Sequence, residues 1–192
     1  WEGMALSSFF LVTTDHRHAE IRRAGYLYLL IAHIGAIAIL LSFGVMTAGS
    51  GDYTFAGMRV QPHTPFWGSA AFLLALFGFG AKAGLLPVHV WLPEAHPAAP
   101  SPVSAMMSGV MLKTAIYGLL RVSFDLVGTP LWWWGVVAMA VGPALLLAAG
   151  DGQSVFWLFY LVSAAQAASV GTRAHVLAVM LVPVLTGFGL FV

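Results

Sequence analysis

Long apolar segments alternate with short polar ones along the whole chain. Most of the apolar segments reach about the 20 residues that a helix needs to cross a hydrocarbon core of about 30 Å. The pattern therefore predicts an all-α fold, a polytopic transmembrane helical bundle that forms one domain over residues 1–192. Both ends of the chain fall within apolar segments, so we interpret it as an internal fragment of a longer subunit. Helices are expected at about residues 1–13, 25–46, 66–96, 102–121, 131–149, 154–170 and 175–192.

The third predicted helix, residues 66–96, is not expected to run straight. Proline removes a backbone donor and clashes with the preceding turn of a helix. A continuous helix of this length would also measure about 46 Å, too long for a simple span. We therefore expect a discontinuous helix, broken near residues 83–93, whose freed carbonyls face protein or water. Half of the ten prolines fall at this end of the helix or just beyond it: Pro87, Pro93, Pro97, Pro100 and Pro102.

Lys82 and Lys113 are the only lysines in the chain, and both lie in apolar helices. A charge near the middle of a spanning helix costs roughly 2.5 to 3.5 kcal/mol, and such residues usually face a bundle interior or a water path. Lys82 could instead snorkel to an interface, but its depth and the adjacent helix break favour a functional role. Lys113 is predicted close to the bilayer centre, with Tyr117 one turn away on the same face. Glu2 is predicted to lie within the hydrocarbon layer.

The composition narrows the classes of function. The chain is 60% hydrophobic and 8% charged, against about 25% charged residues in soluble domains, which indicates a membrane protein. A net charge of +1, spread over short loops, offers no basic face for nucleic acid. Without cysteine the chain forms no disulfide, thiolate nucleophile or cysteine-ligated cluster. We expect no cofactor and no catalytic redox centre, so an enzymatic role would belong to the complex that contains the chain.

Three histidines and one tyrosine are candidates for proton relay. His33 lies on an apolar helix, where a packing histidine is the commoner case. His89 and His96 flank the second half of the broken helix, where they could deliver protons to it. Glu94 lies between these two histidines, but no cysteine or further ligand cluster accompanies them, and we expect no metal. Tyr117 is the remaining relay candidate.

Residues 78–121 read GFGAKAGLLPVHVWLPEAHPAAPSPVSAMMSGVMLKTAIYGLLR. This segment strongly resembles the proton-conducting, antiporter-like membrane subunits shared by respiratory complex I, Mrp-type cation/proton antiporters and energy-converting NiFe hydrogenases. It is most similar to the large antiporter-like subunit of formate hydrogenlyase and hydrogenase-4-type complexes. The first residues, WEGMALSSFFLVTTDHR, resemble the fifth helix of the same family. The resemblance covers about residues 1–122.

The resemblance implies roles for five residues. Glu2 matches the glutamate that pairs electrostatically with the lysine of the broken helix, and Lys82 matches that lysine. Lys113 matches the central lysine that passes the proton on. Trp91 and Pro93 match residues that shape the cytoplasmic side of the break.

The resemblance ends at about Gly142. The family usually continues with an Asp-x-Lys-Arg turn and a polar helix, whereas this chain has Asp151-Gly152-Gln153-Ser154 followed by an apolar stretch. The residue that would take the proton from Lys113 is therefore not visible downstream.

These observations predict a proton-translocating membrane subunit of a redox-driven complex, either a hydrogenase or formate hydrogenlyase or a complex I-like assembly. Protons would move through buried lysine and glutamate residues. The expected partners are other membrane subunits, a peripheral redox arm, the lipid bilayer and protons, with sodium as an alternative ion. The expected location is the inner (plasma) membrane of a prokaryote, with residues 15–24 in the cytoplasm. Two alternatives stay open: a sodium or potassium/proton antiporter module, and a non-conducting membrane anchor.

Overall fold

The computed structural model describes residues 1–47, 49–85, 88–128 and 130–138, and all regular structure in these ranges is helical. This confirms the all-α class for the described part of the chain. The chain divides into two compact units, Trp1–Val127 and Gly128–Val192. The described part of the second unit holds one helical stretch at residues 132–138. The rest of the predicted helix 131–149, and the predicted helices 154–170 and 175–192, lie outside the described residues.

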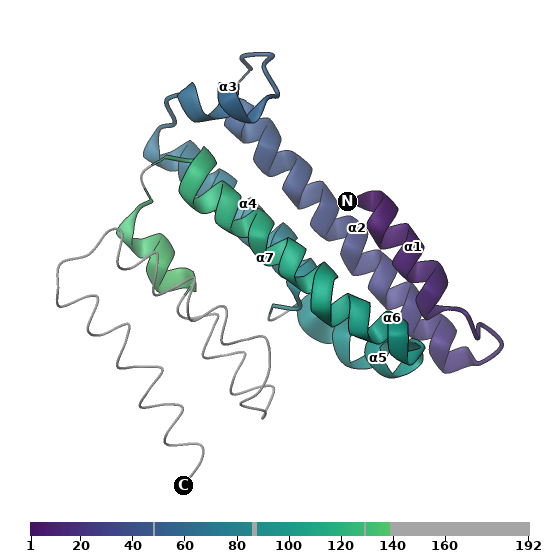
Figure 1. The fold of residues 1–192 in the computed structure, drawn as a ribbon. Helices are drawn as coiled ribbons and strands as arrows, with labels where there is room; N and C mark the ends of the chain where they lie inside the picture. The colour runs from purple at the N-terminus through teal and green to yellow at the C-terminus, as the bar shows by residue number, and fades with distance from the viewer. Residues whose placement is uncertain (48, 86–87, 129, 139–192) are drawn as a thin grey trace, which may run out of the picture. The chain divides into compact units, whose positions relative to one another are not determined.

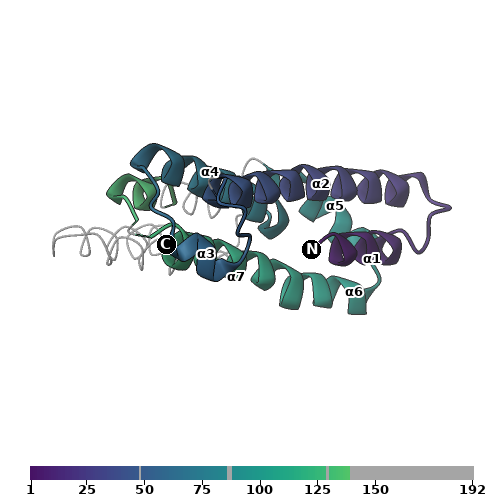
Figure 2. The same cartoon turned by 90° about the horizontal axis from the view of Figure 1, so that it is seen from above.

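The first unit is a bundle of long helices with shorter elements at its ends. In Figures 1 and 2, α1, α2, α4 and α7 run alongside one another, with α3 at one end and α5 and α6 at the other. The elements in chain order are α1 (Glu2–Val12), α2 (Ala19–Thr47), α3 (Phe55–Val60), α4 (Pro65–Ala83), the 3-10 turn η1 (Val88–Val90), α5 (Trp91–Ala98), α6 (Ser101–Met106), the π-helical turn η2 (Met107–Met111), α7 (Leu112–Arg121) and the π-helical turn η3 (Val122–Leu126).

Within the described residues, three stretches are long and apolar enough to cross a membrane: Ala19–Thr47, Pro65–Ala98 and Ser101–Leu126. The first begins before its predicted start at residue 25. Its opening turns are polar, so the apolar pattern did not include them. The third also continues beyond its predicted end at residue 121, since η3 prolongs α7. α1 is a shorter apolar helix.

The helix break lies at the end of α4. Gly84 adopts a left-handed conformation with φ of 78°, which a residue without a Cβ atom reaches without strain. The N–H groups of Gly84 and Leu85 both bond to the carbonyl of Gly80, which closes the last turn. The chain resumes as η1 and α5, so the predicted discontinuous helix is confirmed. Pro87 lies outside the described residues, and its predicted part in shaping the break stays a prediction.

α2 and α4 form the most extensive helix contact of the unit. The two helices meet at Gly35 and Gly78, where a Cβ atom added to Gly78 would lie 2.6 Å from the carbonyl oxygen of Gly35. Small residues allow membrane helices to approach this closely. The contact therefore fixes the register between α2 and the C-terminal half of α4.

Gly78→Ala is expected to destabilise the bundle by about 1–3 kcal/mol, because the added methyl group meets backbone atoms that cannot rotate away. Gly44→Ala, on α2, is the matched control, since nothing lies within 4 Å of its added Cβ. That control should be neutral or stabilising by up to about 1 kcal/mol through helix propensity. Thermal unfolding of both variants in detergent compares them. Equal stabilities would contradict the glycine contact.

The connection between α2 and α4 contains the short helix α3. The hydroxyl of Thr54 caps this helix by accepting the Gly57 N–H at 3.1 Å. Arg59 then donates two hydrogen bonds of 2.7 Å to the carboxylate of Asp125 at the end of η3. These bonds raise the pKa of Arg59 above its usual value and hold α3 against the end of the third long stretch.

Candidate functional site

Lys82 lies in the last turn of α4, two residues before the break at Gly84. Only 2% of its surface is exposed. Its ammonium group donates a 2.7 Å hydrogen bond to the hydroxyl of Tyr28 and lies 4.7 Å from the centre of the Tyr28 ring. The C-terminal end of a helix also favours a nearby positive charge. The structure therefore surrounds the charged form of Lys82 with compensating groups inside the bundle.

Tyr28 is the principal partner of Lys82, and the sequence pattern did not predict it. It is 1% exposed and lies on the face of α2 that packs inward. The other buried residues of this face are mostly alanine and glycine, including Ala24, Gly25, Ala32 and Gly35. Tyr28 could have been singled out from the sequence because it is a large side chain with a hydroxyl group on a face of otherwise mostly small residues.

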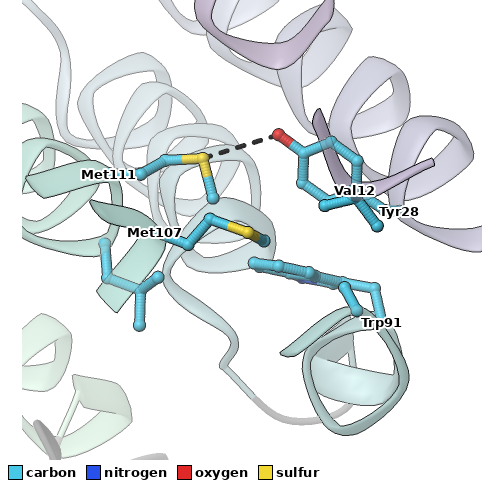
Figure 3. Packing of buried hydrophobic residues seen from close by; sticks show 7 residues of the cluster. Val12, Tyr28, Trp91, Met107 and Met111 are labelled. Atoms are coloured by element: carbon cyan, nitrogen blue, oxygen red, sulfur yellow. Dashed lines mark hydrogen bonds between the residues drawn. The ribbon is translucent and has the colours of Figure 1, made fainter. Parts of the chain in front are cut away.

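Trp91 joins the two halves of the broken helix next to this pair. Its ring contacts the ring of Tyr28 edge to face, with centroids 5.1 Å apart (Figure 3). Its indole N–H donates a 2.8 Å hydrogen bond to the carbonyl of Ala81. That carbonyl belongs to the last turn of α4, where the break leaves acceptors without helical partners. Trp91 thus begins α5 and satisfies the end of α4.

The Met111 sulfur completes the pocket around the Tyr28 hydroxyl. Figure 3 shows Met111 pointing at this hydroxyl, with a distance of 3.5 Å between oxygen and sulfur, while Met107 lies beside Trp91. Ser8 of α1 also approaches the Met111 sulfur, at 3.7 Å. Both methionines come from η2, and π-helical turns often occur at functional sites. The surroundings of Lys82 are therefore weakly polar, without a directly bonded carboxylate in the described part of the chain.

Glu2 contacts His33 instead of Lys82. The Glu2 carboxylate lies 3.4 Å from the Nε2 atom of His33, and both side chains are nearly half exposed. The Nδ1 atom of His33 lies 2.9 Å from the carbonyl of Leu29. The implied pairing of Glu2 with Lys82 is thus not a direct contact in the structure, where the ammonium group bonds to Tyr28.

Lys113 and Tyr117 share the exposed face of α7, one helical turn apart. In the described part of the chain, neither side chain has a hydrogen-bonding or ionic partner. Lys113 therefore points away from the pocket that holds Lys82. The structure brings together Lys82, Tyr28, Trp91 and Met111, and places Lys113 on the outer side of this unit.

The remaining candidates lie on η1 and α5. The Nδ1 atom of His96 lies 2.6 Å from the hydroxyl oxygen of Ser104, which links α5 to α6. The Nδ1 atom of His89 is buried and has no hydrogen-bond partner among the described residues. Pro93 lines a cavity of about 510 Å³ between the start of α2 and α5. The cavity is also lined by Arg23 and Glu94, whose side chains are 3.8 Å apart, and by His18 and Glu20.

No group of three or more potential metal ligands occurs among the residues that the structure describes. The chemistry that the residues present can support is proton exchange at a buried amine. A desolvated ammonium with one hydroxyl partner is well suited to change its charge when its surroundings change, because burial disfavours the charged form and opposite charge or hydrogen bonding restores it.

The fold and the site define a helical membrane protein with an ionisable residue buried at a helix break. The chain belongs to the family described as NADH:quinone oxidoreductase/Mrp antiporter, TM, which matches residues 1–152. This confirms the resemblance inferred from residues 78–121. The match also continues about ten residues past Gly142, where the resemblance was expected to end.

Similar proteins include components of several membrane complexes. Hydrogenase-4 component B of Escherichia coli (strain K12) is 52% identical over 145 residues, which cover 74% of this chain and 21% of that protein. Formate hydrogenlyase subunit 3 of the same strain is 32% identical, over 73% of this chain and 22% of that protein. One component of a probable K(+)/H(+) antiporter of Rhizobium meliloti (strain 1021) is 32% identical, over 78% of this chain and 15% of that protein. The chain thus spans about a fifth of the length of the first two proteins.

Proposed function

We propose that the chain is a proton-translocating part of a membrane subunit in a redox-driven complex, of the hydrogenase, formate hydrogenlyase or complex I-like type. The observation that carries this proposal is Lys82, an almost fully buried lysine at the break of a membrane-spanning helix. Intramembrane ionisable residues of this kind usually mark ion pathways. The relation to Hydrogenase-4 component B supports the hydrogenase type of complex. We further propose the inner membrane of a prokaryote as its location.

In the proposed mechanism, Lys82 alternates between holding and releasing a proton. Its charged form is favoured by the Tyr28 hydroxyl and by the electrostatic influence of Glu2, and is disfavoured by burial. A movement of Glu2 between His33 and the Lys82 pocket would change that balance. The neighbouring redox proteins of the complex would supply the charge change that drives it, since we expect no redox centre in the chain itself.

The proton route on either side of Lys82 uses the remaining candidates. The cavity beside α5 and the histidines His89 and His96 lie on the part of the chain that begins at the break, so we assign them to proton entry. Lys113 and Tyr117 are proposed to accept the proton on the outer face of α7, where neighbouring helices of the assembled protein would meet them. The π-helical turn η2 connects the two regions, because Met111 touches Tyr28 and directly precedes α7.

Lys113→Ala tests this route. In sealed vesicles that contain the assembled complex, the variant is expected to lose proton translocation while electron transfer is partly retained, because the proton leaving Lys82 finds no acceptor. Thr114→Ala is the matched control, since Thr114 is the next exposed residue of α7 and its hydroxyl donates to the carbonyl of Val110 in the same helix. Wild-type translocation in Lys113→Ala would remove Lys113 from the mechanism.

The same vesicles separate the two alternatives. A potassium or sodium/proton antiporter module, which the relation to the Rhizobium meliloti antiporter component favours, predicts transport that depends on the added cation and continues without electron donor. A non-conducting anchor predicts normal assembly and electron transfer with no proton movement in the wild type. Proton movement that requires electron transfer and is unaffected by sodium or potassium supports the proposed function.

A further inference from the structure

We propose that Tyr28 is the positioning residue that holds the Lys82 ammonium group in its pocket and sets the pH range over which Lys82 exchanges its proton. The inference rests on the proposed function, since it assigns a control group to the same proton-carrying lysine. It is carried by the 2.7 Å hydrogen bond between two side chains that are each at most 2% exposed. Neither the resemblance nor the similar proteins assign a role to this tyrosine.

The hydroxyl of Tyr28 acts as acceptor toward Lys82. An ammonium group has only donors, so the hydroxyl oxygen must accept and direct its own proton elsewhere. That proton points to the Met111 sulfur at 3.5 Å, a weak acceptor that leaves the oxygen lone pairs available to Lys82.

The position of Tyr28 is fixed by the packing around it. The Gly35–Gly78 contact sets the distance between α2 and α4, and therefore how far the hydroxyl reaches toward Lys82. Trp91 packs against the ring and is itself tied to the carbonyl of Ala81. A movement of α5 relative to α4 would consequently act on Tyr28 first and on Lys82 through it.

Other titratable groups on the surrounding elements do not replace Tyr28. They are Glu2 on α1; Glu20, Arg22, Arg23, Tyr26 and His33 on α2; His89 on η1; Glu94 and His96 on α5; and Lys113, Tyr117 and Arg121 on α7. The Glu2 carboxylate lies 3.4 Å from His33. In the described part of the chain, none of these groups forms a hydrogen bond or ion pair with Lys82 or Tyr28. The Tyr28 hydroxyl is thus the direct compensation for burying the ammonium group.

Tyr28→Phe tests the proposal, because it keeps the ring and its contacts and removes only the acceptor. Without that acceptor the charged form of Lys82 is less favourable, so the lysine should lose its proton at lower pH. The pH profile of proton translocation by the assembled complex is expected to move about one unit toward acid. Tyr26→Phe is the matched control on the same helix, since its side chain is 66% exposed; its profile should coincide with that of the wild type.

A second measurement follows Lys82 without relying on transport. The complex is produced with 15N-labelled lysine, and the Lys82 Nζ resonance is identified by its loss in Lys82→Arg. Its titration midpoint should fall in Tyr28→Phe and stay unchanged in Tyr26→Phe. An unchanged midpoint and pH profile in Tyr28→Phe would overturn the role of Tyr28 while leaving the proposed function intact. A wild type that translocates no protons would overturn the proposed function, and the resonance would still decide the role of Tyr28.

If Tyr28→Phe fails to assemble, the double variant Tyr28→Phe/Lys82→Met shows whether the cause is the uncompensated ammonium group or lost packing. If the tyrosine serves to compensate the buried ammonium group, removing that group restores assembly and thermal stability. If the double variant also fails, Tyr28 is required for packing alone and the proposal is wrong.

Discussion

Lys82→Met is expected to abolish proton translocation while leaving the assembled protein as stable as the wild type or more stable. Lys82 is almost fully buried, and its ammonium group has a hydroxyl as its direct partner. Replacing buried charged groups by apolar side chains of similar volume is often neutral or stabilising, because the cost of removing the charge from water disappears. Methionine has a similar length, and the Tyr28 hydroxyl keeps Met111 as a partner. Proton-coupled electron transfer and thermal unfolding measured on the same preparation report both effects.

Two further variants separate the charge of Lys82 from its ability to release a proton. Lys82→Arg keeps a positive charge that is effectively never lost in proteins, so it should assemble but fail to translocate protons. Leu73→Met, on an exposed position of α4, controls for substitution in this helix and should behave as wild type. Normal translocation in Lys82→Arg would show that only the charge matters.

Trp91→Ala is expected to lower the free energy of unfolding by about 3–5 kcal/mol, the range found when a large buried aromatic side chain is removed. Trp91 is 1% exposed and packs with Tyr28, Met107 and Met111 in one buried cluster. Its loss also leaves the Ala81 carbonyl without its 2.8 Å hydrogen bond at the end of α4. The two halves of the broken helix should then separate more easily.

Trp91→Phe isolates the hydrogen bond from the packing. This variant retains most of the ring volume but no N–H donor, so it should cost about 1–3 kcal/mol, the penalty of a buried acceptor left unpaired. Trp67→Ala is the control, because Trp67 lies on the same membrane-spanning stretch but is 54% exposed. The three variants are compared by thermal unfolding and by assembly of the complex. A Trp91→Ala protein as stable as Trp67→Ala would show that Trp91 does not join α4 to α5.

The helix break was predictable because proline and glycine act locally on the backbone. The cluster from Pro87 to Pro102 indicated an interruption, and the structure places it at Gly84, where a left-handed residue ends α4. Helix ends in polar segments were harder to predict. The first turns of α2 are helical, but they contain Arg22 and Arg23 and therefore show no apolar pattern from which a helix could be predicted.

The partners of the candidate residues were less predictable than the residues themselves. Lys82 stood out because a charge in an apolar helix is costly, whereas its contact with Tyr28 depends on how closely α2 and α4 cross. The packing of α1 on α2 likewise places His33 within 3.4 Å of Glu2. Such distances follow from helix packing between residues far apart in the sequence, which no local pattern encodes. The roles of Glu2, Lys113 and the relay histidines therefore stay predictions.

The number of protons translocated per electron pair tests the central claim most directly. It is measured in sealed vesicles for the wild-type complex and for Lys82→Met, after assembly of both has been verified, with a protonophore to define the baseline. Because Lys82 is proposed to carry the proton, the wild type should give a protonophore-sensitive ratio above the baseline, and Lys82→Met should give the baseline at a measurable rate of electron transfer. A wild-type ratio in Lys82→Met would contradict the claim that protons pass through this lysine.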